Sequence, residues 1–425
     1  MTQSEVTQRE IIREVMNPLR QKIEQEIRDR GPIPFSHYME LCLYDPDHGY
    51  YSRNAEQFGK SGDFYTSSDV HAVFGRLMAR QFDEMWRALG SPEKIAVVEL
   101  GPGRGLFAQD VLDWSEKKFP DFFRALRYIL VESSQPLRQR IEATLARHFK
   151  SGSTAFASER EPGLAERTAK GTTSVFEPAL SERSDRRVPK SGAHTWALAP
   201  EVPLVVFANE FFDALPVEII SPLGSLHIDT REGRLVETWA SSSPEELEFL
   251  DRYSIHPEPD ERVEVPLIAQ QYMHGTASTI HRGFLIAIDY GYTRAEQLAG
   301  RHRGTLKAIR QHSVSANPYE APGEQDITAD VNFTALAAAA EQHGMQTQKL
   351  ITQSQFLMGI GENTQFADAF EDCRLPQERA KVALQLKHLV TPAGMGESFH
   401  VLIACKGIEE EKVAALSGLS FERNS

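Results

Sequence analysis

Apolar residues along this chain fall into short runs that alternate with amphipathic stretches. Runs at 95–100, 126–131, 204–208 and 284–288 are apolar almost throughout and predict buried strands. Helical spacing follows at 106–118 and 136–149, and again at 333–343, before further predicted strands at 346–352 and 399–406. Apolar strands joined by helices predict an α/β fold with a parallel sheet covered on both faces.

Three segments interrupt this alternation. Residues 1–90 predict an N-terminal region of helices, at 11–28, 35–43 and 70–89, joined by turn-rich loops. Residues 151–200 are rich in Ser, Glu, Arg, Pro and Gly and predict a surface insertion. Short apolar runs within 216–282 predict a small inserted β-rich region on the substrate side. The core is therefore assigned to 91–215 and 283–425.

Composition narrows the classes of function. The 425 residues include 46 basic and 60 acidic side chains, a net charge of −14, which disfavours nucleic-acid binding. Cys42, Cys373 and Cys405 lie far apart, and the histidines lack metal-ligand spacing, so we expect no metal site. We expect no membrane span, and the acidic N-terminal segment, unlike a transit peptide, predicts a cytoplasmic protein.

A glycine-rich turn, Glu99 to Gly105, follows the first core strand and opens a helix. Glycines let the backbone approach a ligand closely, and a helix N-terminus attracts an anionic group. A dinucleotide fingerprint would need glycine at position 106, where this chain has Leu106. The turn therefore favours S-adenosylmethionine over NAD, with Glu99, Gly101 and Gly103 as binding residues.

The second core strand ends at Glu132, followed by Ser133. An acidic residue at this place accepts hydrogen bonds from ribose hydroxyls, so both residues are predicted to bind the cofactor. Structural alternatives are an ordinary strand–helix turn for 99–105 and a helix N-terminal charge for Glu132.

Several segments together resemble the MidA family of class I S-adenosylmethionine-dependent methyltransferases. They occur in the family's order through most of the chain, with departures at 66–69, where Thr-Ser-Ser-Asp replaces Thr-Ser-Pro-Glu, and at the expanded 151–200. The matching segments are 31–35 (GPIPF), 44–51 (YDPDHGYY), 62–67 (GDFYTS), 74–75 (FG), 99–105 (ELGPGRG), 209–216 (NEFFDALP), 288–291 (IDYG), 303–306 (RGTL) and 323–333 (GEQDITADVNF).

The resemblance implies a Rossmann-like sheet with an antiparallel last strand. It also implies that residues 1–90 cover the cofactor, with the loop residues Gly62, Asp63, Phe64 and Thr66 in its pocket. The implied reaction is methylation of a protein arginine, as in the mitochondrial relatives that assist respiratory complex I assembly. The resemblance accordingly implies a protein partner and, more specifically, a subunit of a respiratory complex.

The acceptor side is predicted at the carboxyl ends of the strands, where Asn209, Glu210 and Asp213 follow 204–208. Carboxylates would hold a guanidinium and remove its proton, so Glu210 is predicted to bind the guanidinium and to act as base, with Asp213 as a second carboxylate. Asn209 is predicted either to orient an N–H group of the acceptor or to support the cofactor. The alternative is a structural role, which would be a salt bridge for Glu210 and a helix cap for Asp213. For Asp289 and Tyr290 the functional and the structural interpretations are balanced. A small-molecule O- or N-methyltransferase and a non-catalytic assembly factor also stay open.

Overall fold

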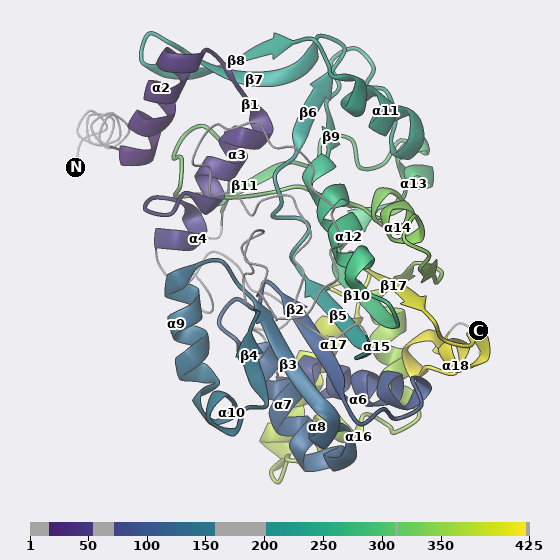
Figure 1. Cartoon of the computed structure of the whole chain (residues 1–425). Coiled ribbons are helices and arrows are strands. Elements are labelled where there is room, and N and C mark those ends of the chain that lie inside the picture. Colours follow the sequence, from purple (N-terminus) through teal and green to yellow (C-terminus); the bar gives the residue numbers. More distant parts are fainter. Residues whose placement is uncertain (1–16, 54–71, 158–200, 311–312, 316, 422–425) are drawn as a thin grey trace, which may run out of the picture.

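The computed structural model describes residues 17–53, 72–157, 201–310, 313–315 and 317–421 (Figure 1). Its centre is a nine-stranded sheet whose main path runs β15-β17-β10-β5-β2-β3-β4. Strands β10, β5, β2, β3 and β4 are parallel, and β17 pairs antiparallel with β10. This order confirms the predicted methyltransferase-type sheet with its antiparallel last strand. The strands are β2 Ile95–Leu100, β3 Leu126–Val131, β4 Thr154–Phe156, β5 Leu204–Asn209, β10 Gly283–Tyr292, β14 Val331–Asn332, β15 Gln346–Thr347, β16 Ile351–Thr352 and β17 Phe399–Lys406.

Helices cover both faces of this sheet, which is why its strands are apolar throughout. In β2, Ile95 and Val97 join one buried cluster, while Ala96 and Val98 join the other. The first cluster includes side chains of α6 Ala72–Ala88, α7 Leu106–Lys118, α8 Pro120–Ala125, α9 Gln135–Thr144, α15 Gln353–Glu362, α16 Ala367–Phe370, α17 Pro376–Val390 and α18 Glu410–Ala414. The second cluster includes side chains of α12 Leu267–Thr279 and α14 Phe333–Glu341. Also described are α10 Ala146–Ser151, α13 Arg294–Leu298 and η2 Ser417–Leu419.

A second β layer joins the N-terminal region to the inserted strands, in the upper part of Figure 1. Strand β1 Ile33–Pro34 pairs antiparallel with β7 Gly224–Arg231, so segments almost 200 residues apart share one sheet. Its core combines Phe35 and Tyr38 with Leu226 and Ile327. The other elements are α2 Pro18–Arg30, α3 Phe35–Tyr44, α4 Tyr50–Arg53, β6 Glu218–Ser221, β8 Arg234–Ala240, α11 Pro244–Tyr253, β9 Val263–Val265, β11 Lys307–Arg310, β12 Ser313–Ser315 and β13 Asp326–Thr328.

Some elements differ from the sequence predictions. Helix α12, placed by prediction in the inserted region, packs on the parallel sheet through Ala269, Met273 and Ala277, so the inserted strands end before it. Strands β11 and β13 pair with each other, and their residues Ala308 and Ile327 join the core of the N-terminal region rather than that of the parallel sheet. Pro18 begins α2 behind the cap Asn17, because proline fits the first helical turn. The part of the chain that the structure describes has no helix that is both long and apolar enough to cross a membrane.

Candidate active site

The glycine turn connects β2 to α7 in a backbone conformation that favours glycine. Gly101, Gly103 and Gly105 have φ angles of 64°, 53° and 75°, all left-handed. A Cβ atom on Gly103 would meet no heavy atom of the described residues within 4 Å, so these residues leave open space beside the turn. A Cβ on Gly101 would lie 2.9 Å from Phe211 Cδ2, which brings residues 209–216, here called the acceptor segment, against the turn. The turn therefore presents backbone without side chains at Gly101 and Gly103, as the predicted close approach of a ligand would require.

Glu99 lies beneath this turn rather than in the open space. Its side chain is 5 % exposed and accepts a hydrogen bond of 2.9 Å from the hydroxyl of buried Tyr128. Burial raises the pKa of Glu99 to about 8, against the smaller opposing effect of the Tyr128 hydrogen bond. These contacts indicate that Glu99 supports the turn from inside the protein.

Glu132 follows β3 at the same edge of the sheet. Its Oε1 accepts a hydrogen bond of 2.7 Å from the backbone N–H of Ser134, while Ser133 is exposed. Burial raises the pKa of Glu132 to about 7, and the Ser134 and Ser133 backbone bonds lower it. The Ser134 hydroxyl donates to the Tyr51 carbonyl at 3.2 Å, which holds α4 beside this acid. The remaining predicted cofactor residues, Gly62, Asp63, Phe64 and Thr66, lie outside the described residues.

The acceptor segment begins where β5 ends. Asn209 is the last residue of β5, and its Nδ2 donates to Glu210 Oε1 at 3.0 Å. Glu210 has φ 50°, a left-handed conformation that is uncommon for a residue with a side chain. Its backbone N–H donates to the Ile288 carbonyl at 2.9 Å, which fixes this bend against β10. Such strain marks functional positions when neighbouring structure enforces it.

Asp289 on β10 holds the acceptor segment in place. Its Oδ2 accepts backbone N–H bonds from Phe211, Phe212 and Asp213 at 3.2, 3.0 and 3.3 Å. Asp289 is fully buried, and its pKa is raised by burial and by Glu210 against the lowering effect of these backbone bonds. Of the two roles left balanced for Asp289, its contacts in the structure are those of a positioning residue.

Carboxylates gather around Asp213. This side chain is 4 % exposed, and its pKa is raised well above its usual range by burial and then by Asp289, Glu210 and Asp326. By strict geometry, Asp213 Oδ1, Asn209 Oδ1 and the Tyr290 hydroxyl are buried without a well-aligned hydrogen bond among the described residues, although the Tyr290 hydroxyl lies close enough to Asp213 to lower its pKa. Unsatisfied buried polar atoms are costly, so they indicate a site completed by a polar ligand. A concentration of negative charge favours a cationic one.

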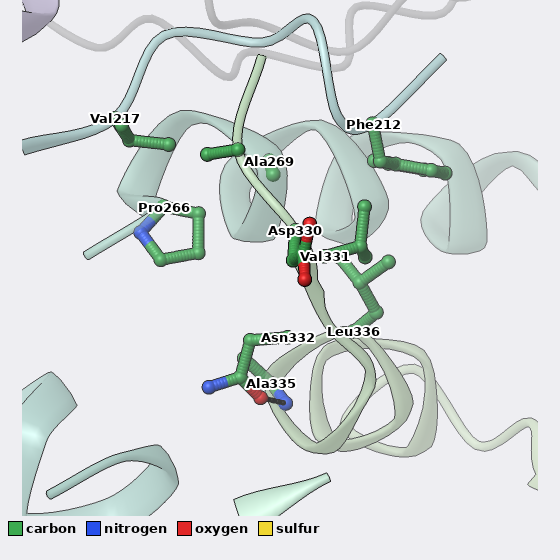
Figure 2. A pocket seen from close by; sticks show the side chains of 10 residues that line it. Phe212, Val217, Pro266, Ala269, Asp330, Val331, Asn332, Ala335 and Leu336 are labelled. Atoms are coloured by element: carbon green, nitrogen blue, oxygen red, sulfur yellow. Dashed lines mark hydrogen bonds between the residues drawn. The ribbon is translucent and has the colours of Figure 1, made fainter. Parts of the chain in front are cut away.

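A small cavity lies behind the acceptor segment (Figure 2). Its volume of about 10 Å³ is near the minimum for one water molecule, so it is too small for a cofactor or an acceptor. The cavity lies between the acceptor segment and the helices α12 and α14. It is lined by Phe212, Val217, Pro266, Ala269, Ala329, Asp330, Val331, Asn332, Ala335 and Leu336.

The sequence reasoning missed several residues near the acceptor segment. The Tyr44 hydroxyl donates to the Ala214 carbonyl at 2.9 Å, and Tyr272 on α12 lies with its ring centroid 4.9 Å from that of Phe211. Asp326 contributes charge to Asp213. Tyr44 and Asp326 belong to segments that the family resemblance includes, but neither periodicity nor spacing connects them to the acceptor segment. Among the described residues, no group of three or more His, Cys, Asp or Glu side chains could hold a metal ion.

Related proteins place this geometry in context. A protein arginine methyltransferase NDUFAF7 homolog of Drosophila melanogaster is 28 % identical over 92 % of this chain and 85 % of its own. The protein arginine methyltransferase NDUFAF7 of Homo sapiens is 28 % identical over 91 % and 82 %. A Burkholderia thailandensis structure described as a "likely methyl transferase" bound to S-adenosyl-homocysteine has a TM-score of 0.73 at 25 % identity, covering 95 % of this chain and 94 % of that one.

These relatives correct one prediction. The animal proteins are named as mitochondrial, so the cytoplasmic location predicted from the N-terminal composition is wrong. Acidic residues near the start of the sequence determine the charge of that segment, and this charge alone does not identify the compartment of a protein.

The family itself is shown by a match that spans most of the sheet. A family model of S-adenosyl-L-methionine-dependent methyltransferases matches residues 77–351, which include the glycine turn, Glu132 and the acceptor segment. The chain belongs to this family of S-adenosylmethionine-dependent methyltransferases.

Proposed function

We propose that this methyltransferase transfers the methyl group to an arginine side chain of a protein substrate. The observation that carries the proposal is the buried carboxyl group of Asp213, which lies among the acidic side chains of Asp289, Glu210 and Asp326. Relatives named protein arginine methyltransferases support it. The finer part, a respiratory-complex subunit as substrate, is supported by the family resemblance alone.

The position of each proposed cofactor residue gives it a different role. Gly101 and Gly103 would bind the amino-acid end of S-adenosylmethionine with bare backbone, and Glu132 with Ser133 would bind the ribose. Glu99 would maintain the turn from below. The loop residues Gly62, Asp63, Phe64 and Thr66 remain a proposal from the family resemblance. The bound cofactor supplies an electrophilic methyl group on a sulfonium sulfur.

The acceptor residues would bind the guanidinium and accept its proton. In the proposed step, a guanidinium nitrogen forms a bond to the methyl carbon while the sulfur–carbon bond breaks, and S-adenosylhomocysteine leaves. The nitrogen loses one proton to Glu210, which passes it to solvent. Asn209 would orient Glu210 through its 3.0 Å hydrogen bond, and Asp213 would hold the guanidinium.

This proposal is tested with methyl-labelled S-adenosylmethionine and a cell lysate. We expect label in a polypeptide with the wild-type enzyme and its loss with Glu210→Gln. Label confined to small molecules would contradict a protein substrate and favour the small-molecule methyltransferase alternative. Binding of S-adenosylhomocysteine without transfer to any acceptor would favour the non-catalytic assembly factor.

A further inference from the structure

The aromatic ring of Phe211 lies between the glycine turn and the proposed base. A Cβ on Gly101 would lie 2.9 Å from Phe211 Cδ2, so the ring packs directly against the turn. The preceding residue is Glu210, whose left-handed φ of 50° bends the backbone at this point. The Phe211 N–H donates to Asp289 Oδ2 at 3.2 Å, which fixes the backbone that carries the ring. A methyl group that moves from the turn toward Glu210 would therefore pass beside this ring.

Helix α12 supplies a second ring that packs against the first. The ring centroids of Phe211 and Tyr272 lie 4.9 Å apart, with an interplanar angle of 59°. The Phe212 ring lies 5.3 Å from that of Phe211 in an edge-to-face arrangement. Such aromatic pairs have preferred geometries, so the two neighbours orient the Phe211 ring. Both Phe211 and Tyr272 are half-buried among the described residues.

The two rings lie beside both ends of the proposed cofactor site. The Gly101 N–H donates to the Val131 carbonyl at 3.1 Å, which places the turn next to Glu132. Burial raises the pKa of Tyr272, and the nearby charge of Glu132 raises it further. In S-adenosylmethionine the sulfonium sulfur joins the amino-acid chain to the ribose. A cofactor bound by the turn and by Glu132 would therefore have its sulfur between them, beside Phe211.

We propose that the Phe211 ring contacts the sulfonium of S-adenosylmethionine, with Tyr272 as its positioning residue, so that the enzyme distinguishes cofactor from product. The face of an aromatic ring attracts a cation. The sulfonium carries a positive charge, whereas the thioether of S-adenosylhomocysteine carries none, so the ring would favour the cofactor and ease product release. This inference rests on the proposed cofactor site and is independent of the identity of the methyl acceptor.

The test uses the full-length enzyme without a methyl acceptor. Calorimetry measures affinities for S-adenosylmethionine, S-adenosylhomocysteine and sinefungin, which carries an ammonium group where the cofactor has its methyl sulfonium. In Phe211→Leu we expect the ratio of S-adenosylmethionine to S-adenosylhomocysteine affinity to fall about fivefold, and sinefungin should follow S-adenosylmethionine. Tyr272→Leu should lower the same ratio about twofold, whereas Phe211→Tyr, which retains the aromatic face, should keep it. Phe370→Leu is the matched control, because Phe370 is half-buried against the other core cluster.

A ring-fluorinated phenylalanine at position 211 separates charge recognition from packing. Fluorination keeps the shape of the ring but weakens its negative face, so it should lower S-adenosylmethionine affinity and leave S-adenosylhomocysteine affinity at the wild-type value. An affinity ratio that stays at the wild-type value in this variant and in Phe211→Leu would overturn the inference and leave the proposed function intact. Wild-type enzyme that binds none of the three ligands would overturn the proposed cofactor site itself. If Phe211→Leu fails to fold, the fluorinated variant decides.

Discussion

The glycine turn and the acceptor segment touch at Gly101 and Phe211, yet they are built differently. Seven contiguous residues form the turn, and its three left-handed glycines would make the proposed binding surface from backbone. The acceptor segment depends on distant side chains, with Asp289 from β10 and Tyr44 from α3 bonded to its backbone. A locally encoded site should fail through substitutions within it, whereas an assembled site should also fail through residues that never touch substrate.

The largest expected effect is on chemistry. Glu210→Gln should lower kcat by about 100- to 1,000-fold, because the amide has the shape of the carboxylate but accepts no proton. Single-turnover assays measure the loss, and calorimetry with S-adenosylhomocysteine is the control, since the turn is untouched. An equal loss of cofactor affinity would show that the turn and the acceptor segment act as one site. That result would contradict the distinction drawn between them.

The next effect tests the assembled character of the acceptor segment. Asp289→Ala leaves three backbone N–H groups without their acceptor and should lower the free energy of unfolding by about 3 kcal/mol. Methyl transfer should fall as well, although Asp289 is not proposed to contact substrate. Urea denaturation measures the stability, and exposed Asp251→Ala should change it by less than about 0.5 kcal/mol. Full activity in Asp289→Ala would refute a positioning role.

The local character of the turn is tested at Gly103. Gly103→Val should weaken S-adenosylhomocysteine binding about 100-fold, because valine is strained at φ 53° and its side chain would enter the open space beside the turn. Gly300→Val is the control, because Gly300 is also left-handed and no atom in the described part of the chain lies within 4 Å of its Cβ position. Calorimetry that shows unchanged binding for Gly103→Val would argue strongly against this cofactor site.

The smallest effect concerns the acid beneath the turn. The pKa of Glu99 is raised by burial to about 8, so the folded state binds more protons than the unfolded state above pH 4.5. Stability from this group is therefore lost as pH rises, by about 2 kcal/mol between pH 6 and 8. Glu99→Gln should flatten this part of the wild-type profile measured by urea denaturation. An unchanged pH slope would show that Glu99 is not the buried acid described here.

Sequence patterns predicted the sheet well, because its strands are buried on both faces and read as continuous apolar runs. Strands β2, β3 and β17 match their predicted limits, as does helix α7. The glycine turn was also predictable, because its residues are contiguous in the sequence. The helix expected at 136–149 divides into α9 and α10 around Leu145, a break for which the sequence offers neither proline nor glycine.

Contacts between distant segments were beyond prediction from periodicity. The bond between Tyr51 and Asp326 joins residues 275 positions apart, and β1 pairs with a strand from the inserted region. Asp289 was recognised as a strand-end acid, but its bonds to Phe211, Phe212 and Asp213 depend on the register of β10 beside β5. The acceptor segment was therefore identified by its place at the sheet edge, whereas its geometry required the fold.

The central claim is methyl transfer to arginine, and amino-acid analysis of the labelled polypeptide tests it most directly. After transfer from methyl-labelled S-adenosylmethionine, the polypeptide is hydrolysed to amino acids and the labelled residue is identified by chromatography against standards. We predict label in methylarginine with the wild-type enzyme and its absence with Glu210→Gln. Label in methyllysine or in a base-labile ester, with none in methylarginine, would contradict the account.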